Sequence, residues 1–212
     1  MTPEQSNEWF ARHFELAPVM AILRGLGLDE TLAASRRAWD AGAELVEIPL
    51  QRAEDRDVVV RAVELGHVGG KAVGVGTVLD VGAVQTAHAL GAAFTVSPGF
   101  SAEVYRESLR LDMPSLPGVA TATEIQAAFA SGALWLKAFP AKDLGTNWIS
   151  AMLAPFPDVR IVATGGVTAS SAEQFLSAGA AAVAIGSAIA NADLSPLLGR
   201  SNGVTRAVPD TR

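Results

Sequence analysis

Residues 130–140, ASGALWLKAFP, carry a pattern that recurs along the chain: a glycine, an alanine and then a short apolar run. The pattern returns as DAGAELVEI (40–48), ALGAAFTVS (89–97) and SAGAAAVAI (177–185). A glycine just after a helix is a common left-handed cap. The apolar runs are too short for buried helices and have the composition of strands covered on both faces. Each occurrence therefore predicts the end of a helix followed by a buried strand.

Short apolar runs of this kind alternate with helix-like segments at a spacing of roughly 20–28 residues. They are 19–24, 45–50, 72–78, 94–99, 114–120, 135–140, 161–166 and 182–187. A doubly wound sheet is the main rival, but eight units and a missing G-x-G-x-x-G fingerprint favour an α/β fold of the (β/α)8 TIM-barrel type.

The ends of the chain complete the predicted organisation. An amphipathic N-terminal helix over about 3–16 is expected to close the bottom of the barrel. Because no linker or low-complexity segment divides the chain, residues 1–212 are expected to form one domain, with 200–212 as a flexible tail.

The repeated glycines also place four residues at one level of alternate strands. Counting five residues on from each glycine reaches strands 2, 4, 6 and 8 at Glu47, Val96, Lys137 and Ala184. Alternate strands of a TIM barrel contribute the four inward side chains of one layer. Strands 2 and 6 lie opposite each other in a ring of eight, so Glu47 and Lys137 are predicted to face each other.

A lysine and a glutamate inside a barrel have a structural and a chemical explanation. Either residue alone is more often structural, for example a lysine near a strand end that reaches water. A buried ion pair, however, costs several kcal/mol of desolvation per ion and stabilises poorly, so the pair argues for a use. Burial disfavours the ammonium form, and a free amine attacks ketones to give a Schiff base. A facing carboxylate can move the protons of an aldol cleavage, so Lys137 and Glu47 are the predicted catalytic residues.

Composition argues against several other chemistries. The net charge is -6 and no basic cluster occurs, so no nucleic acid is expected as a partner. The chain has no cysteine, which excludes disulfides, thiolate catalysis and cysteine-ligated metals. The three histidines are scattered over expected helices and loops, so no metal and no other cofactor are expected. We expect a cytoplasmic protein without membrane contact, because no membrane-length apolar run and no signal-peptide core occur.

Glycines follow the last two expected strands, in ATGGVT (163–168) and IGSAIA (185–190). TIM barrels often bind phosphate after strands 7 and 8 through backbone N–H groups. Phosphate is therefore predicted to bind at Gly165, Gly166, Gly186 and Ser187.

Two further side chains stand at strand ends. Arg24 ends strand 1 and can hold a carboxylate or a phosphate, or form a salt bridge that orients Glu47. Thr77 can present its hydroxyl at the upper end of strand 3, and the glycines just before it can relieve crowding in the barrel.

Motifs at nearly every strand end resemble one enzyme family. AILRG, VEIPL, GVGTVLD, VSPGF, PGVATATE, LKAFPA and ATGGV, from about residue 15 to residue 190, are similar to motifs of the class I 2-keto-3-deoxy-6-phosphogluconate and 2-keto-3-deoxy-6-phosphogalactonate aldolases. The related activity on 4-hydroxy-2-oxoglutarate belongs to the same family. The resemblance implies a homotrimeric barrel whose lysine imine cleaves a phosphorylated keto sugar acid to pyruvate and glyceraldehyde 3-phosphate, without a metal. It assigns the keto-acid end of the substrate to Arg24, Thr77, Pro98 and Phe139.

The resemblance leaves the sugar undecided between the two C4 epimers. Gln51 stands where the gluconate type has an arginine and is closer to the asparagine of the galactonate type. Thr164, before the Gly-Gly pair, resembles the gluconate type. AILRG and VEIPLQ lean slightly towards galactonate. The alternatives are another phosphate-binding barrel enzyme without an imine, such as an isomerase or a synthase, an aldolase acting mainly on 4-hydroxy-2-oxoglutarate, and a non-catalytic sugar-phosphate binder.

Overall fold

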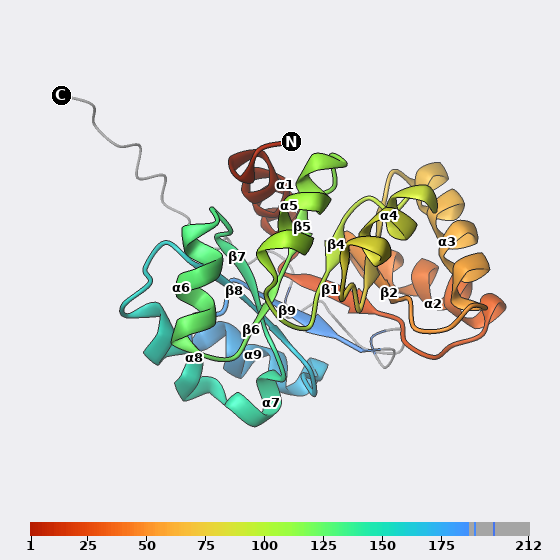
Figure 1. Cartoon of the computed structure of the whole chain (residues 1–212). Helices are drawn as coiled ribbons and strands as arrows, with labels where there is room; N and C mark the ends of the chain where they lie inside the picture. Colours follow the sequence, from red (N-terminus) through yellow and green to blue (C-terminus); the bar gives the residue numbers. More distant parts are fainter. Residues whose placement is uncertain (187–188, 190–196, 198–212) are drawn as a thin grey trace.

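The computed structural model describes residues 1–186 together with Ile189 and Leu197. Within this part of the chain, parallel strands form one sheet that curls into a nearly closed barrel with helices outside it (Figure 1). The strands are β1 (Val19–Ile22), β2 (Leu45–Pro49), β3 (Ala72–Gly76), β4 (Thr95–Val96), β5 (Ser115–Leu116), β6 (Gly118–Val119), β7 (Trp135–Ala138), β8 (Arg160–Thr164) and β9 (Ala182–Ile185). The predicted barrel is confirmed. The single-domain assignment stays a prediction, and the proposed tail at 200–212 lies outside the described residues.

One predicted strand is divided in two. The run over 114–120 forms β5 and β6 on either side of Pro117. Proline has no N–H to donate to a neighbouring strand, so the ladder is interrupted there. β5 pairs with β4 and β6 pairs with β7, so the two halves stand at opposite ends of the order β5-β4-β3-β2-β1-β9-β8-β7-β6. Their continuity through Pro117 joins those ends and gives the ring its closure.

The helices occupy the connections that the alternation predicts. They are α1 (Pro3–Leu16), α2 (Leu28–Asp40), α3 (Asp55–Gly69), α4 (Val81–Ala89), α5 (Ala102–Arg110), α6 (Ala122–Ala130), α7 (Ala141–Leu144), α8 (Thr146–Leu153) and α9 (Ala169–Ser177). None of these helices is long and apolar enough to cross a membrane.

Four helix ends share one turn, as the repeated pattern predicts. Gly42, Gly91, Gly132 and Gly179 have φ of 102°, 80°, 85° and 104°, in the region that favours glycine. In each turn the N–H of the following alanine donates to the carbonyl oxygen five residues earlier, at 3.0 to 3.1 Å, which is the Schellman arrangement. Because the turns are alike, the strands that follow them start at equivalent positions.

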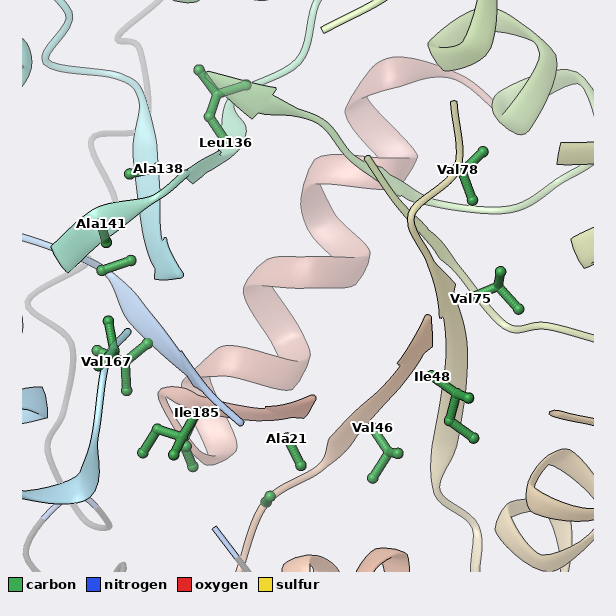
Figure 2. Close-up of a cluster of buried hydrophobic side chains, with 14 of the residues drawn as sticks. Ala21, Val46, Ile48, Val75, Val78, Leu136, Ala138, Ala141, Val167 and Ile185 are labelled. Atoms are coloured by element: carbon green, nitrogen blue, oxygen red, sulfur yellow. The ribbon is translucent and has the colours of Figure 1, made fainter. Parts of the chain in front are cut away.

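Side chains of successive strand residues separate into two clusters. One side of the strands packs against the surrounding helices, and Figure 2 shows this outward cluster with Val46, Ile48, Val75, Leu136 and Ile185 labelled. The other side faces the inside of the barrel. The alternation follows from the strand period of two residues, so Glu47 and Lys137, which neighbour Val46 and Leu136, point inward.

Helix α1 fills the lower, N-terminal end of the barrel, which confirms the predicted closing helix. Phe10 and Phe14 of α1 are fully buried in the inward cluster. The Phe14 ring stacks on Trp135 with 5.0 Å between centroids, and the Phe10 ring meets Phe94 edge-on at 6.0 Å. Figure 2 shows α1 in pale red among the strands. This plug fills the lower half of the barrel with apolar groups and leaves the upper end for polar ones.

Candidate active site

Glu47 and Lys137 face each other inside the barrel, as the repeated turns predict. β2 carries Glu47 and β7 carries Lys137, on opposite sides of the ring. Lys137 Nζ lies 3.8 Å from Glu47 Oε2, and the two side chains are 4% and 0% exposed. Val96 and Ala184, the other members of the predicted layer, belong to the inward cluster. The predicted juxtaposition is therefore confirmed.

The surroundings of this ion pair do little to stabilise it. A separation of 3.8 Å is too long for a hydrogen bond. Neither carboxylate oxygen of Glu47 accepts a hydrogen bond from the part of the chain that the structure describes. Taking each charge out of water costs several kcal/mol, which attraction offsets only with good geometry and further hydrogen bonds. The pair is therefore better explained by chemistry than by stability.

An aromatic ring stands beside the lysine. Phe139 follows Lys137 by two residues, and its ring centroid lies 5.1 Å from Lys137 Nζ. A side chain at Gly165 would come within 2.9 Å of this ring, so the ring rests directly on the backbone after β8. The ring thus gives the amine an apolar wall on one side.

A cavity of about 350 Å³ opens next to the lysine at the carboxyl ends of the strands. It brings together residues from β1, β7, β8 and β9, which are neighbours in the sheet. Its walls are Ile22, Arg24, Lys137, Phe139, Thr164, Gly165, Gly166, Ala184 and Gly186. Seven of these nine are sequence-predicted site residues; Ile22 and Ala184 were not predicted as site residues and add apolar surface.

The predicted phosphate-binding loop after β8 has the left-handed backbone conformation that favours glycine. Gly165 and Gly166 have φ of 96° and 73°. The Gly165 carbonyl oxygen accepts a hydrogen bond from the backbone N–H of Lys142 at 2.9 Å, which ties this loop to α7. Gly186 stands at the end of β9 on the same cavity, whereas Ser187 lies outside the described residues.

Arg24 lies at the end of β1 with its side chain exposed, on the wall of the cavity. The alternative role of a salt bridge that orients Glu47 is wrong, because the carboxylate of Glu47 pairs with Lys137 and not with Arg24. The physical reason is position, because the Glu47 side chain is fully buried inside the barrel whereas the Arg24 side chain is exposed to solvent. Its guanidinium is thus available to an anion in the cavity.

Three predicted residues lie at strand ends but are not part of the cavity wall. Thr77 is half-buried with φ of 61°, a region that β-branched residues rarely adopt, so the chain bends sharply after β3. Pro98 is half-buried after β4, and its carbonyl oxygen occupies the place that a side chain at Gly118 would take. Gln51 is exposed after β2, and its backbone N–H donates to Asp55 Oδ2 at 3.0 Å.

Asp55, which was not predicted as a site residue, organises this loop after β2. Its carboxylate accepts hydrogen bonds from the backbone N–H groups of Gln51 and Arg52 and from the Arg52 guanidinium. Burial raises the pKa of Asp55, but these donors together lower the pKa below its usual value. The signal in the sequence is an aspartate at the start of a helix, where it can accept from preceding N–H groups.

Gly76 and Lys142 also lie close to the site. A side chain at Gly76 would collide with the Glu47 carboxylate, and one at Gly166 would collide with the stem of Lys142. The glycines of β3 therefore relieve crowding, as predicted. The stem of Lys142 thus lies against the glycine loop after β8.

A second, smaller cavity of about 200 Å³ lies at the other end of the barrel. Trp9 and His13 of α1, His67 and Lys71 are among its walls. Neither Glu47 nor Lys137 reaches it, so the chemistry belongs to the upper cavity.

Known proteins resemble this chain over most of its length. Residues 11–197 match the family model for KDPG and KHG aldolase. A 2-dehydro-3-deoxy-6-phosphogalactonate aldolase of Escherichia coli (strain K12) is 38% identical over 80% of this chain and 83% of its own. A 2-dehydro-3-deoxy-phosphogluconate aldolase of Pseudomonas aeruginosa is 35% identical over 78% of this chain and 73% of its own.

Solved structures agree with these relatives. The KDPG aldolase of Legionella pneumophila, with pyruvate captured at low pH as a covalent carbinolamine intermediate, superposes with a TM-score of 0.76 at 25% identity. The match covers 90% of this chain and 92% of that one. With the matching family model and the identity to the two curated aldolases, the chain belongs to the KDPG and KHG aldolase family and is a carbon–carbon lyase.

Proposed function

We propose that this aldolase works through a Schiff base on Lys137. The observation that carries the proposal is the buried amine of Lys137, 3.8 Å from the Glu47 carboxylate and on the wall of the upper cavity. A structural relative with a covalent pyruvate carbinolamine supports it.

The substrate is a 2-keto-3-deoxy-6-phospho sugar acid. Lys137 passes a proton to Glu47, and its free amine attacks the C2 ketone. Glu47 returns the proton to the carbinolamine hydroxyl, which leaves as water and gives a protonated imine. Glu47 takes the proton of the C4 hydroxyl, directly or through a water, as the C3–C4 bond breaks and its electron pair moves to the imine nitrogen. Glyceraldehyde 3-phosphate leaves. The enamine is then protonated at C3 and hydrolysed to pyruvate, which restores the free lysine. Proton transfer by a positioned carboxylate accelerates such steps by roughly 10²–10⁴-fold.

The two ends of the substrate are both anionic and need separate contacts. Arg24, Thr77, Pro98 and Phe139 are proposed to hold the keto-acid end. The phosphate is proposed to bind at Gly165, Gly166, Gly186 and Ser187. The cavity wall supports an anionic substrate, because its described residues include the cations Arg24 and Lys137 and exposed glycine backbone, and no carboxylate.

The C4 configuration is proposed to be read by Gln51 and Thr164. Thr164 is buried on the cavity wall, and its hydroxyl donates to the carbonyl oxygen of Val162 at 3.2 Å. The named relatives include both galactonate and gluconate enzymes. Assays of both epimers in parallel, with 4-hydroxy-2-oxoglutarate as a third substrate, decide the preference. Assembly as a homotrimer is part of the same proposal, and light scattering of the purified protein measures it.

Borohydride reduction in the presence of pyruvate tests the Schiff base. The chain has three lysines, Lys71, Lys137 and Lys142, so peptide mass spectrometry can assign the adduct without ambiguity. We expect one reduced pyruvate on Lys137, its loss in Lys137→Arg, and its retention in the matched control Lys142→Arg. An adduct on another lysine refutes the role of Lys137. No adduct at all, with turnover present, favours a barrel enzyme that forms no imine.

A further inference from the structure

Gly76, the last residue of β3, lies directly against the carboxylate of Glu47. A Cβ atom built on Gly76 would stand 1.9 Å from Glu47 Oε1, 2.6 Å from Cδ and 2.8 Å from Cγ. Real Cβ atoms essentially never approach other atoms within 3.0 Å. Any other residue at position 76 therefore forces the carboxylate to move.

The backbone itself does not require glycine at this position. Gly76 is not among the glycines with positive φ, and the left-handed residue at this bend is its neighbour Thr77. The carbonyl oxygen of Gly76 accepts an ordinary hydrogen bond from the N–H of Leu50 at 3.0 Å. Because other residues adopt such a conformation easily, what matters at position 76 is the absent side chain.

Packing, rather than hydrogen bonding, holds the carboxylate. Both oxygens of Glu47 are buried and receive no hydrogen bond from the described residues. Their electrostatic partner is the ammonium of Lys137 at 3.8 Å. Without hydrogen-bond donors to fix it, the carboxylate occupies the space that β3 leaves open. That space exists because Gly76 has no side chain.

We infer that Gly76 is a positioning residue: its bare backbone sets the place of the Glu47 carboxylate relative to the reacting lysine. The inference rests on the proposed function, in which Glu47 transfers protons during C3–C4 cleavage. Gly76 is not on the cavity wall, so it acts through Glu47 and not by contact with the substrate.

The geometry gives the size of the expected effect. Moving Oε1 from 1.9 Å to at least 3.0 Å from a new methyl group displaces it by about 1.1 Å. A misplacement of about 1 Å in a catalytic arrangement can reduce the rate by roughly 10²-fold. We therefore expect Gly76→Ala to lower kcat by about two orders of magnitude with KM little changed.

Gly74 provides a matched control on the same strand and the same inward face. A Cβ atom on Gly74 would meet the ring of Phe94 at 2.5 Å, and its three nearest atoms all belong to that ring and not to Glu47. Gly74→Ala should therefore lower the melting temperature through overpacking, while kcat measured well below that temperature stays near the wild-type value. A pair of variants with the same added methyl group thus separates strain in the barrel from displacement of Glu47.

The deciding experiment is a double-mutant cycle with Glu47→Ala. If Gly76 acts only through the carboxylate, adding Gly76→Ala to Glu47→Ala causes no further loss of activity. In melting temperature the double variant should match Glu47→Ala alone, because the side chain that collides with the new methyl group is gone. This second measurement holds even if the single Gly76→Ala variant folds poorly.

Three results overturn the inference while leaving the proposed function intact. The first is a wild-type kcat in Gly76→Ala. The second is a loss of kcat in Gly76→Ala no larger than the loss in Gly74→Ala. The third is a double variant whose loss of kcat equals the product of the losses in Gly76→Ala and Glu47→Ala. A wild-type protein without aldolase turnover or pyruvate trapping instead refutes the proposed function.

Discussion

The ion pair inside the barrel should make the protein less stable than an apolar replacement would. The perturbation is Lys137→Met with Glu47→Leu, singly and together. At 3.8 Å and an effective dielectric constant of about 20, the attraction is about 4 kcal/mol. Desolvation costs several kcal/mol for each ion, so the sum is unfavourable or near zero. The absence of hydrogen bonds to Glu47 from the described residues removes the usual compensation.

Each single variant leaves one charge buried without its partner. Lys137→Met should therefore lose about 3–5 kcal/mol of unfolding free energy, and Glu47→Leu should lose a similar amount. The double variant removes both charges and should be at least as stable as the wild type, with a gain of up to about 4 kcal/mol. Lys137→Met and the double variant should not cleave a keto sugar acid, because the nucleophile is missing. Glu47→Leu should keep only residual activity, roughly 10²–10⁴-fold below the wild type.

Urea unfolding monitored by tryptophan fluorescence measures these differences, with the m-value as a check that unfolding stays two-state. Lys142→Met is the matched control, since Lys142 is exposed and its removal should leave the unfolding free energy nearly unchanged. If the unfolding free energy of the double variant is as low as that of the less stable single variant, the pair stabilises the fold. Stability, and not chemistry, would then explain why the pair is present.

Three further predictions concern the plug, the glycine loop and the surface. Phe14→Ala should destabilise the fold by about 3–5 kcal/mol, because its buried ring packs on Trp135; an unchanged urea midpoint would show that α1 is dispensable. Lys142→Gln should raise KM for the phosphorylated substrate about two- to fivefold, less at high salt, with pyruvate trapping unchanged; equal KM values would leave Lys142 an ordinary loop charge. A hydrogen bond from the Arg110 guanidinium and a smaller contribution from the Gln85 amide lower the pKa of Glu107 from 4.5 to about 2. This lowered carboxyl pKa contributes stability above pH 4.5 that is lost as pH falls towards about 2, so Glu107→Gln should flatten the acid limb of a melting-temperature profile.

Local pattern was enough to predict the barrel and its central pair. The four Gly-Ala turns depend only on the backbone conformation of a few neighbouring residues, so the sequence pattern predicts them. Once the turns are equivalent, counting along the strands brings Glu47 and Lys137 to one layer. Pro117 is also a sequence signal for a strand break, because proline has no N–H to donate to a neighbouring strand. We nevertheless predicted that strand as continuous.

Contacts between distant segments were beyond local pattern. The contacts of Gly76 with Glu47 and of Lys142 with Gly166 depend on different strands and loops that meet in space. The placement of Gln51 outside the cavity wall depends on the path of an exposed loop, which Asp55 ties down.

Short-range backbone and periodicity rules settle the order of strands and helices, the turns that align them, and the two charged residues inside the ring, so these features can be predicted from the amino-acid sequence. The folded chain adds the distance between those charges, the room for the carboxylate, and the set of strand ends that share the cavity. Those features depend on the curvature and closure of the sheet, which bring residues far apart in the chain to within a few ångströms of each other.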